Sequence, residues 1–101
     1  MTPHTLIELT DSAPHTIEFA TVMSVIDSYY DYTPSDFTNG DTHNAAGSNE
    51  GSCKIFAFAK LNKLTLEATL SLFGDFYRKD VLQNPDGTDH ANIRNFIKYG
   101  W

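Results

Sequence analysis

The spacing of apolar residues along the chain predicts a series of short amphipathic helices. The clearest of them has apolar side chains at three- and four-residue intervals, which is the repeat of one helix face. This stripe consists of Phe19, Val22, Met23, Ile26, Tyr29 and Tyr30. An earlier helix is predicted to start at Pro3, because proline suits the first helical position, and to end near residues 11–12. Pro14 then breaks the chain, and Thr16 is placed to cap the helix that carries the stripe.

The densest apolar run of the chain starts at Ile55 and allows two interpretations. Its alternation suits a strand that is buried on both faces, whereas on a helix Ile55, Phe58 and Leu61 share one face. We favour the helix, because Ile55 is the only β-branched residue of the run and its alanines favour helix. Ser52 is expected to cap this helix, which places Cys53 in its first turn, where the helix dipole favours a thiolate.

The segment between these two helices is predicted to be extended at first and then to form a polar loop. Residues 30–33 and 37–38 are predicted to be extended on either side of a turn at Pro34, as a small strand or hairpin at a sheet edge. A long polar loop is expected over residues 39–50.

Helical patterns return in the second half of the chain. Thr65 is placed to cap a helix with a weak point or a break at Gly74. The turn residues 84–87 separate it from a last helix, which is predicted to start at Thr88 or Asp89. The side chains expected to face inward from that helix are Ile93, Phe96 and Ile97.

Together these elements predict one α+β domain over residues 1–101, mostly helical, with about five helices and a minor antiparallel sheet. A chain of 101 residues is long enough to bury a modest core without disulfides or a metal ion. The residues expected to share that core are Phe19, Ile26, Phe56, Phe58, Leu70, Phe73 and Ile93.

The net charge of −6 is unevenly distributed and narrows the choice of partners. Residues 1–53 contain eight acidic residues and no lysine or arginine, whereas residues 54–101 contain all seven basic residues and five acidic ones. Because no basic stripe is present, nucleic acids and anionic membranes are not expected as partners. No stretch has the length of a membrane span or the pattern of a signal peptide. The single cysteine excludes an internal disulfide and is compatible with a reducing cytoplasm.

Seven short segments carry a family resemblance. In chain order they are Val22–Asp27, Tyr32–Pro34, Phe37–Gly40, Asn49–Lys54, Phe76–Leu82, Pro85–His90 and Asn92–Phe96. They extend over most of the chain and together resemble the HopJ type III effector family. The resemblance implies a bacterial protein that acts in the cytoplasm or is delivered into a host by type III secretion. Because no biochemical activity is established for this family, the resemblance assigns no catalytic residue.

The remaining sequence motifs favour a small binding or interaction module over an enzyme. The chain has no phosphate-cradling glycine loop, no G-x-S-x-G motif and no H-E-x-x-H motif. No cofactor is expected, and the partner is expected to be a protein or a small polar ligand.

The alternative is a cysteine-dependent hydrolase or transferase. Residues 51–53 resemble the sequence around papain-like nucleophiles, where a cysteine opens a buried helix. In that interpretation Cys53 attacks, His90 is the base, and Asn92 or Asp89 orients the histidine. A buried structural cysteine is the simpler interpretation, because a three-residue match is common.

Polar residues before two helix starts predict a shared binding site. If the helix with Cys53 and the last helix pack side by side in the same sense, the polar turns before them and two positive helix ends meet. The ligand-binding residues expected there are Asn39, Asp41, His43, Asn49, Glu50, Asp86, Asp89 and His90. Alternatively, each residue only caps its own helix or turn. A metal site is not predicted, because these residues show no recognised spacing of metal ligands.

Overall fold

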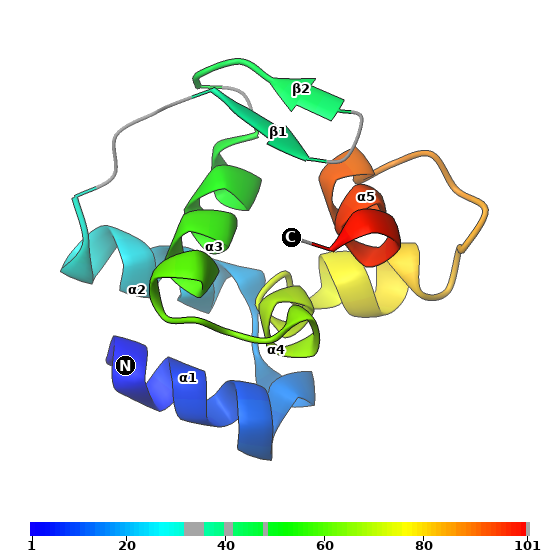
Figure 1. Ribbon diagram of the computed structural model, residues 1–101. Coiled ribbons are helices and arrows are strands. Elements are labelled where there is room, and N and C mark those ends of the chain that lie inside the picture. Colours follow the sequence, from blue (N-terminus) through cyan, green and yellow to red (C-terminus); the bar gives the residue numbers. More distant parts are fainter. Residues whose placement is uncertain (32–35, 40–41, 48, 101) are drawn as a thin grey trace.

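The protein is arranged around one central helix, α3, as Figure 1 shows. The computed structural model describes residues 1–31, 36–39, 42–47 and 49–100. In chain order the elements are α1 (Pro3–Ser12), η1 (Pro14–Thr16), α2 (Phe19–Tyr29), β1 (Phe37–Asn39), β2 (Thr42–Asn44), α3 (Glu50–Leu61), α4 (Leu66–Ser71), η2 (Phe76–Val81) and α5 (Ala91–Tyr99). The fold is α+β and mainly helical, as predicted, and β1 and β2 form a small antiparallel sheet that lies across the start of α3 (Figure 1).

The first helix follows the prediction, but the second begins differently. Pro3 opens α1, and the side chain of Thr2 caps it. The expected cap of α2 by Thr16 is wrong. Its hydroxyl donates to the Ala13 carbonyl at 2.7 Å within the short 3-10 helix η1, and α2 starts only after Glu18.

A single apolar core joins the helices and contains the residues predicted for it. Ile26, Phe58, Leu70, Phe73 and Ile93 are buried, and Phe19 and Phe56 are half-buried against them. Phe56 connects the elements, because its ring centroid lies 5.6 Å from that of Phe73, 5.0 Å from that of Phe96 and 6.2 Å from that of Phe37.

Three residues expected to face inward are exposed instead: Tyr29, Leu61 and Ile97. Tyr29 and Leu61 are the last residues of α2 and α3, where the apolar stripe continues beyond the packed surface. Ile97 lies at the edge of the buried face of α5, which Ile93 and Phe96 form.

The hairpin occurs later in the chain than predicted. Phe37 and Thr38 are extended as expected, but they pair with β2, inside the segment 39–50 that was expected to be a loop. The turn predicted at Pro34 lies outside the described residues. Because Asn39 pairs with Thr42, two residues separate the strands. The dipeptide Gly40-Asp41 is a type favoured in such hairpins, and it was the sequence signal for this pairing.

The helix after α3 is capped and interrupted where predicted. The side chain of Thr65 accepts a hydrogen bond from the Ala68 N–H, and α4 ends before Gly74. Gly74 has a φ of +62°, and a Cβ there would lie 2.8 Å from the backbone nitrogen of Phe19. Glycine is therefore required, and after it the chain forms η2, a π-helix. Nowhere in the described part of the chain is a helix both long enough and apolar enough to span a membrane.

Candidate functional site

Helices α3 and α5 begin at the same pocket, which has a volume of about 320 Å³. Gly51 and Ser52 from the first turn of α3 line it, together with Ala91 and Asn92 from the first turn of α5. The positive ends of both helix dipoles therefore lie at this pocket. The expected shared site required the two helix starts to lie together, and they do so at this pocket.

Both helices begin after a residue with a left-handed backbone and not at the predicted caps. Asn49, with φ 49° and ψ 46°, precedes α3, and His90, with φ 51° and ψ 51°, precedes α5. The predicted starts at Ser52 and at Thr88 or Asp89 are therefore wrong. Left-handed backbone is uncommon for residues other than glycine, although asparagine and histidine adopt it more readily than most.

The way each α-helix begins separates the α-helices of the described chain into two groups. Threonine side chains cap α1 and α4, and neither helix contributes to the pocket lining. Helices α2, α3 and α5 start without a side-chain cap, and each places first-turn residues at the pocket, with Phe19 as the contribution of α2. First-turn N–H groups have no acceptor within their own helix. The edge of the pocket is therefore rich in hydrogen-bond donors.

One wall of the pocket is aromatic. The ring of Phe19 meets that of Phe76 edge to face at a centroid distance of 5.0 Å, and Phe76 lies 5.1 Å from the ring of His90. A Cβ at Gly51 would lie 2.6 Å from the Phe19 ring, so glycine allows this ring to lie against the start of α3. Phe76 is 41% exposed although it is large and apolar, which leaves its ring available to a ligand.

A buried network of asparagine amides holds the polar side of the pocket. Asn44 of β2 and Asn92 of α5 exchange two hydrogen bonds, of 3.0 and 3.1 Å, and are 2% and 5% exposed. The Asn49 amide also donates to Asn44 Oδ1 at 2.6 Å. The network therefore ties the hairpin to the starts of α3 and α5, and it explains why the Asn49 side chain does not cap its own helix.

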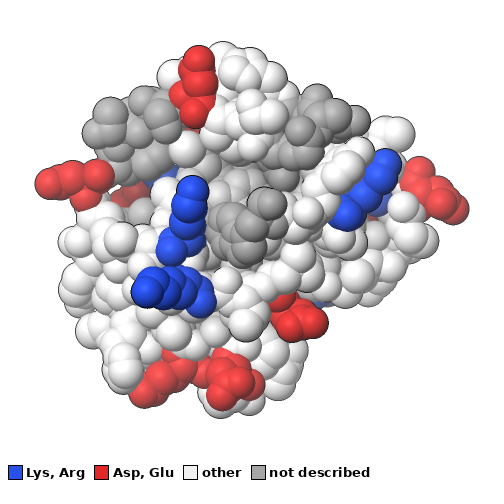
Figure 2. All heavy atoms as spheres, viewed as in Figure 1, with Lys and Arg blue, Asp and Glu red and all other residues white. Residues whose placement is uncertain are grey.

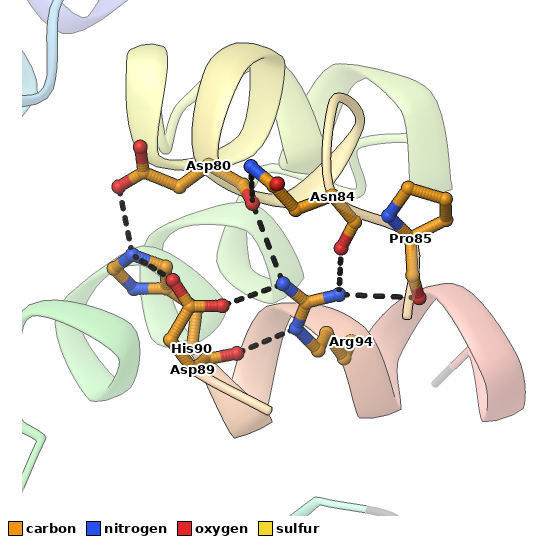
Figure 3. A network of polar contacts seen from close by, with 6 residues as sticks. All are labelled: Asp80, Asn84, Pro85, Asp89, His90 and Arg94. Carbon is orange, nitrogen blue, oxygen red and sulfur yellow. Dashed lines mark hydrogen bonds and ion pairs between the residues drawn. The ribbon is translucent and has the colours of Figure 1, made fainter. Parts of the chain in front are cut away.

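A second polar network lies beside the pocket and contains His90 (Figure 3). His90 Nε2 lies 3.0 Å from Asp80 Oδ2, on η2, and 3.8 Å from Asp89 Oδ2. The Arg94 guanidinium donates to Asp89 Oδ1 and to the Asp89 carbonyl. This hydrogen bond from Arg94 lowers the pKa of the Asp89 carboxyl below its usual value, and burial opposes the shift only in part.

The structure brings together some of the expected ligand-binding residues. Asn49 and His90 line the pocket, Asp89 adjoins His90, and Glu50 is the exposed first residue of α3. His43 and Asp86 are exposed on β2 and on the 84–87 turn, and neither belongs to the pocket lining. Asp41 and the side chain of Asn39 lie outside the described residues. Ligand binding by these residues stays a prediction.

The residues of the alternative cysteine mechanism have other surroundings. Cys53 is 8% exposed. The preceding residue, Ser52, lines the pocket, whereas Cys53 does not. The ring of His90 faces Asp80, and the Asn92 amide pairs with Asn44. These contacts engage the His90 ring and the Asn92 amide with partners other than the thiol, and the mechanism stays a prediction.

Sequence reasoning missed Asn44, Asp80 and Arg94. Asn44 was assigned to a loop, and Asp80 precedes His90 by ten residues, which is not the spacing of a known motif. One sequence feature could have indicated Arg94. It lies four residues after His90, which on a helix places the two side chains on the same face. Charge gave no further guide, since acidic and basic side chains are scattered over the face shown in Figure 2 and form no large patch of one sign.

One family model matches nearly the whole chain. The family described as HopJ type III effector protein matches residues 4–101. The chain is also similar to a crystal structure described as that of an unknown function protein, VPA0580, with 55% sequence identity and a TM-score of 0.94. That match covers 97% of this chain and 82% of the other. A search of curated proteins found no match.

Proposed function

The chain belongs to the HopJ type III effector protein family, and we propose that it acts as a small binding module whose ligand occupies the pocket at the starts of α3 and α5. The pocket itself carries the proposal. Its volume of about 320 Å³ is at the lower end of the roughly 300–1,000 Å³ of small-molecule sites. A larger hollow of about 740 Å³ runs along the surface of α2. Its lining comes from that helix and Met1 alone, whereas several elements meet at the smaller pocket.

The lining of the pocket favours a ligand with two chemically different ends. Phe19 and Phe76 offer aromatic surface to a ring or a short apolar chain. The first-turn N–H groups of α3 and α5 suit a carbonyl or another hydrogen-bond acceptor. Glu50 and Asp80 add negative charge close to these donors, which favours an uncharged acceptor over a strongly anionic one.

Small aromatic amides such as benzamide have this composition and serve as probes. We expect a titration followed by ¹⁵N–¹H NMR to shift the amide signals of Gly51, Ser52, Ala91 and Asn92 together. Shifts centred on Ser24, Val25 and Ser28, which line the larger hollow, or none at millimolar probe, would refute the assignment of the pocket.

Two matched substitutions make this test specific. Ala91 is exposed and lines the pocket, so Ala91→Trp obstructs it without entering the core. Ala57 is exposed on α3 and does not line the pocket, so Ala57→Trp adds the same bulk elsewhere. We expect only Ala91→Trp to abolish the shifts. Equal binding by both variants would mean that the probe occupies another place.

The family description also supports a proposal about location. We propose that the protein acts in a cytoplasm, either that of the bacterium that makes it or, after type III secretion, that of a host cell. A fusion to a translocation reporter distinguishes the two, when expressed in a strain with a working secretion system and in one without. A signal in host cells that requires the secretion system would establish delivery, and its absence would restrict the protein to the producing cell.

A further inference from the structure

Three side chains beside the pocket have the donor atoms of a metal site. Oxygen atoms of Asp80 and Asp89 and a ring nitrogen of His90 all lie within 4.8 Å of one another. We propose that these three side chains bind a divalent transition-metal ion. The site goes beyond the binding module proposed above and does not depend on the ligand of the pocket.

The separations of the donor atoms suit an ion bound between them. Bonds of about 2.0–2.2 Å from nitrogen and oxygen to a zinc-like ion place neighbouring ligand atoms about 3.0–3.6 Å apart. His90 Nε2 lies 3.0 Å from Asp80 Oδ2 and 3.8 Å from Asp89 Oδ2. Figure 3 shows both carboxylates beside the imidazole, Asp80 from η2 and Asp89 from the segment before α5. Small side-chain rotations are therefore sufficient to complete the set.

Arg94 orients one of these ligands from outside. Its guanidinium holds Asp89 Oδ1, which leaves Asp89 Oδ2 on the side of His90. The other acceptors of Arg94 are the backbone carbonyls of Asp80, Asn84, Pro85 and Asp89. A single side chain thus fixes η2 relative to the segment that carries His90. Partners of this kind commonly fix the orientation of metal ligands in proteins.

The donor set selects the class of ion. One imidazole nitrogen with two carboxylates suits Zn²⁺, Mn²⁺ or Fe²⁺, whereas Ca²⁺ and Mg²⁺ prefer sites made of oxygen alone. The carboxylates balance the charge of the ion, and the positive charge of Arg94 opposes it, so we expect moderate affinity. His90 also lines the pocket, so water or a pocket ligand can occupy the remaining coordination positions.

Titration of the full chain with ZnCl₂ and MnCl₂ at neutral pH tests the site. We expect saturable binding of one Zn²⁺ per chain by calorimetry and a change in the imidazole NMR signals of His90. Mn²⁺ should broaden the amide signals of Asp80, Asp89 and His90 first. Absence of saturable binding, or changes centred on His4, His15 or His43, would overturn the proposal.

Two variants and one control identify the ligands. Asp80→Asn removes a charged ligand and keeps its size, and His90→Gln removes the nitrogen ligand. Each should weaken Zn²⁺ binding at least tenfold and abolish the rise in melting temperature that Zn²⁺ gives the unmodified protein. Asp11→Asn changes an exposed aspartate of α1 and should bind as the unmodified protein does. Circular dichroism confirms that each variant is folded. Unchanged affinity in a folded Asp80→Asn would show that the contact between Asp80 and His90 is only an ion pair.

Discussion

The substitution Asn44→Ala tests whether the buried amide network holds the hairpin and two helix starts together. It removes three hydrogen bonds, the two exchanged with Asn92 and the one donated by Asn49. A buried neutral hydrogen bond contributes about 0.5–1.5 kcal/mol net, so the expected loss in the free energy of unfolding is about 1.5–4.5 kcal/mol. This is a large fraction of the roughly 5–15 kcal/mol that stabilises a typical domain.

Urea unfolding followed by far-ultraviolet circular dichroism measures the loss. With an m-value of about 1.5 kcal/mol/M, the midpoint should fall by about 1–3 M. His43→Ala is the matched control, because His43 is the preceding residue of β2 and is exposed, and its ring lies 3.4 Å from the Thr38 hydroxyl. It should change the stability by less than about 0.5 kcal/mol.

A double-mutant cycle separates the amide pair from a general effect on the hairpin. If Asn44 and Asn92 interact as described, the loss from replacing both by alanine should differ from the sum of the single losses by about 0.5–3 kcal/mol. Additive losses, or an Asn44→Ala variant as stable as His43→Ala, would refute the reasoning. The network would then be a consequence of the fold and not one of its supports.

Three further predictions concern the core, the chain break and the cysteine. Phe58→Ala should lose about 3–5 kcal/mol in urea unfolding, because the side chain is 3% exposed in the core, and a loss below about 1 kcal/mol would contradict its assignment. Gly74→Ala should lower the free energy of unfolding more than Gly47→Ala in the same assay. Both glycines have positive φ, but of the two only a Cβ at Gly74 would meet the backbone of Phe19, so equal losses would argue against that contact. Cys53 should react slowly with iodoacetamide at neutral pH until denaturant is added, and rapid labelling of the native protein, read by mass spectrometry, would revive the enzyme alternative.

The sequence was sufficient for the parts of the fold that depend on local signals. Pro3 and Thr65 marked helix starts correctly, since a proline ring or a threonine hydroxyl acts on its own first turn. Gly74 marked the break for an equally local reason, its positive φ. Each signal lies within a few residues of the structure that it determines.

The parts that were missed depend on contacts between distant residues. Ser52 is a good capping residue, yet α3 starts earlier, after Asn49. The side-chain amide of Asn49 is held there by its hydrogen bond to Asn44 Oδ1. Asp80 meets His90 where η2 and the segment before α5 are joined by Arg94 and by the contact of Phe76 with His90. The sequence offered the meeting of two helix starts as one of two alternatives, whereas the partners of each side chain there could not be derived from it.

Several departures from local rules meet at the pocket, although Lys63, which does not line it, also has left-handed backbone. Where a helix obeys the capping rules, as α1 and α4 do, it lies away from the pocket lining. At the pocket, Asn49 and His90 adopt left-handed backbone, a large phenylalanine is exposed, and asparagine amides are buried. Each of these features costs stability, and all of them are difficult to explain by packing alone. Sequences usually depart from local consistency at functional sites, so their coincidence at the pocket is a stronger argument for binding there than any one of the residues.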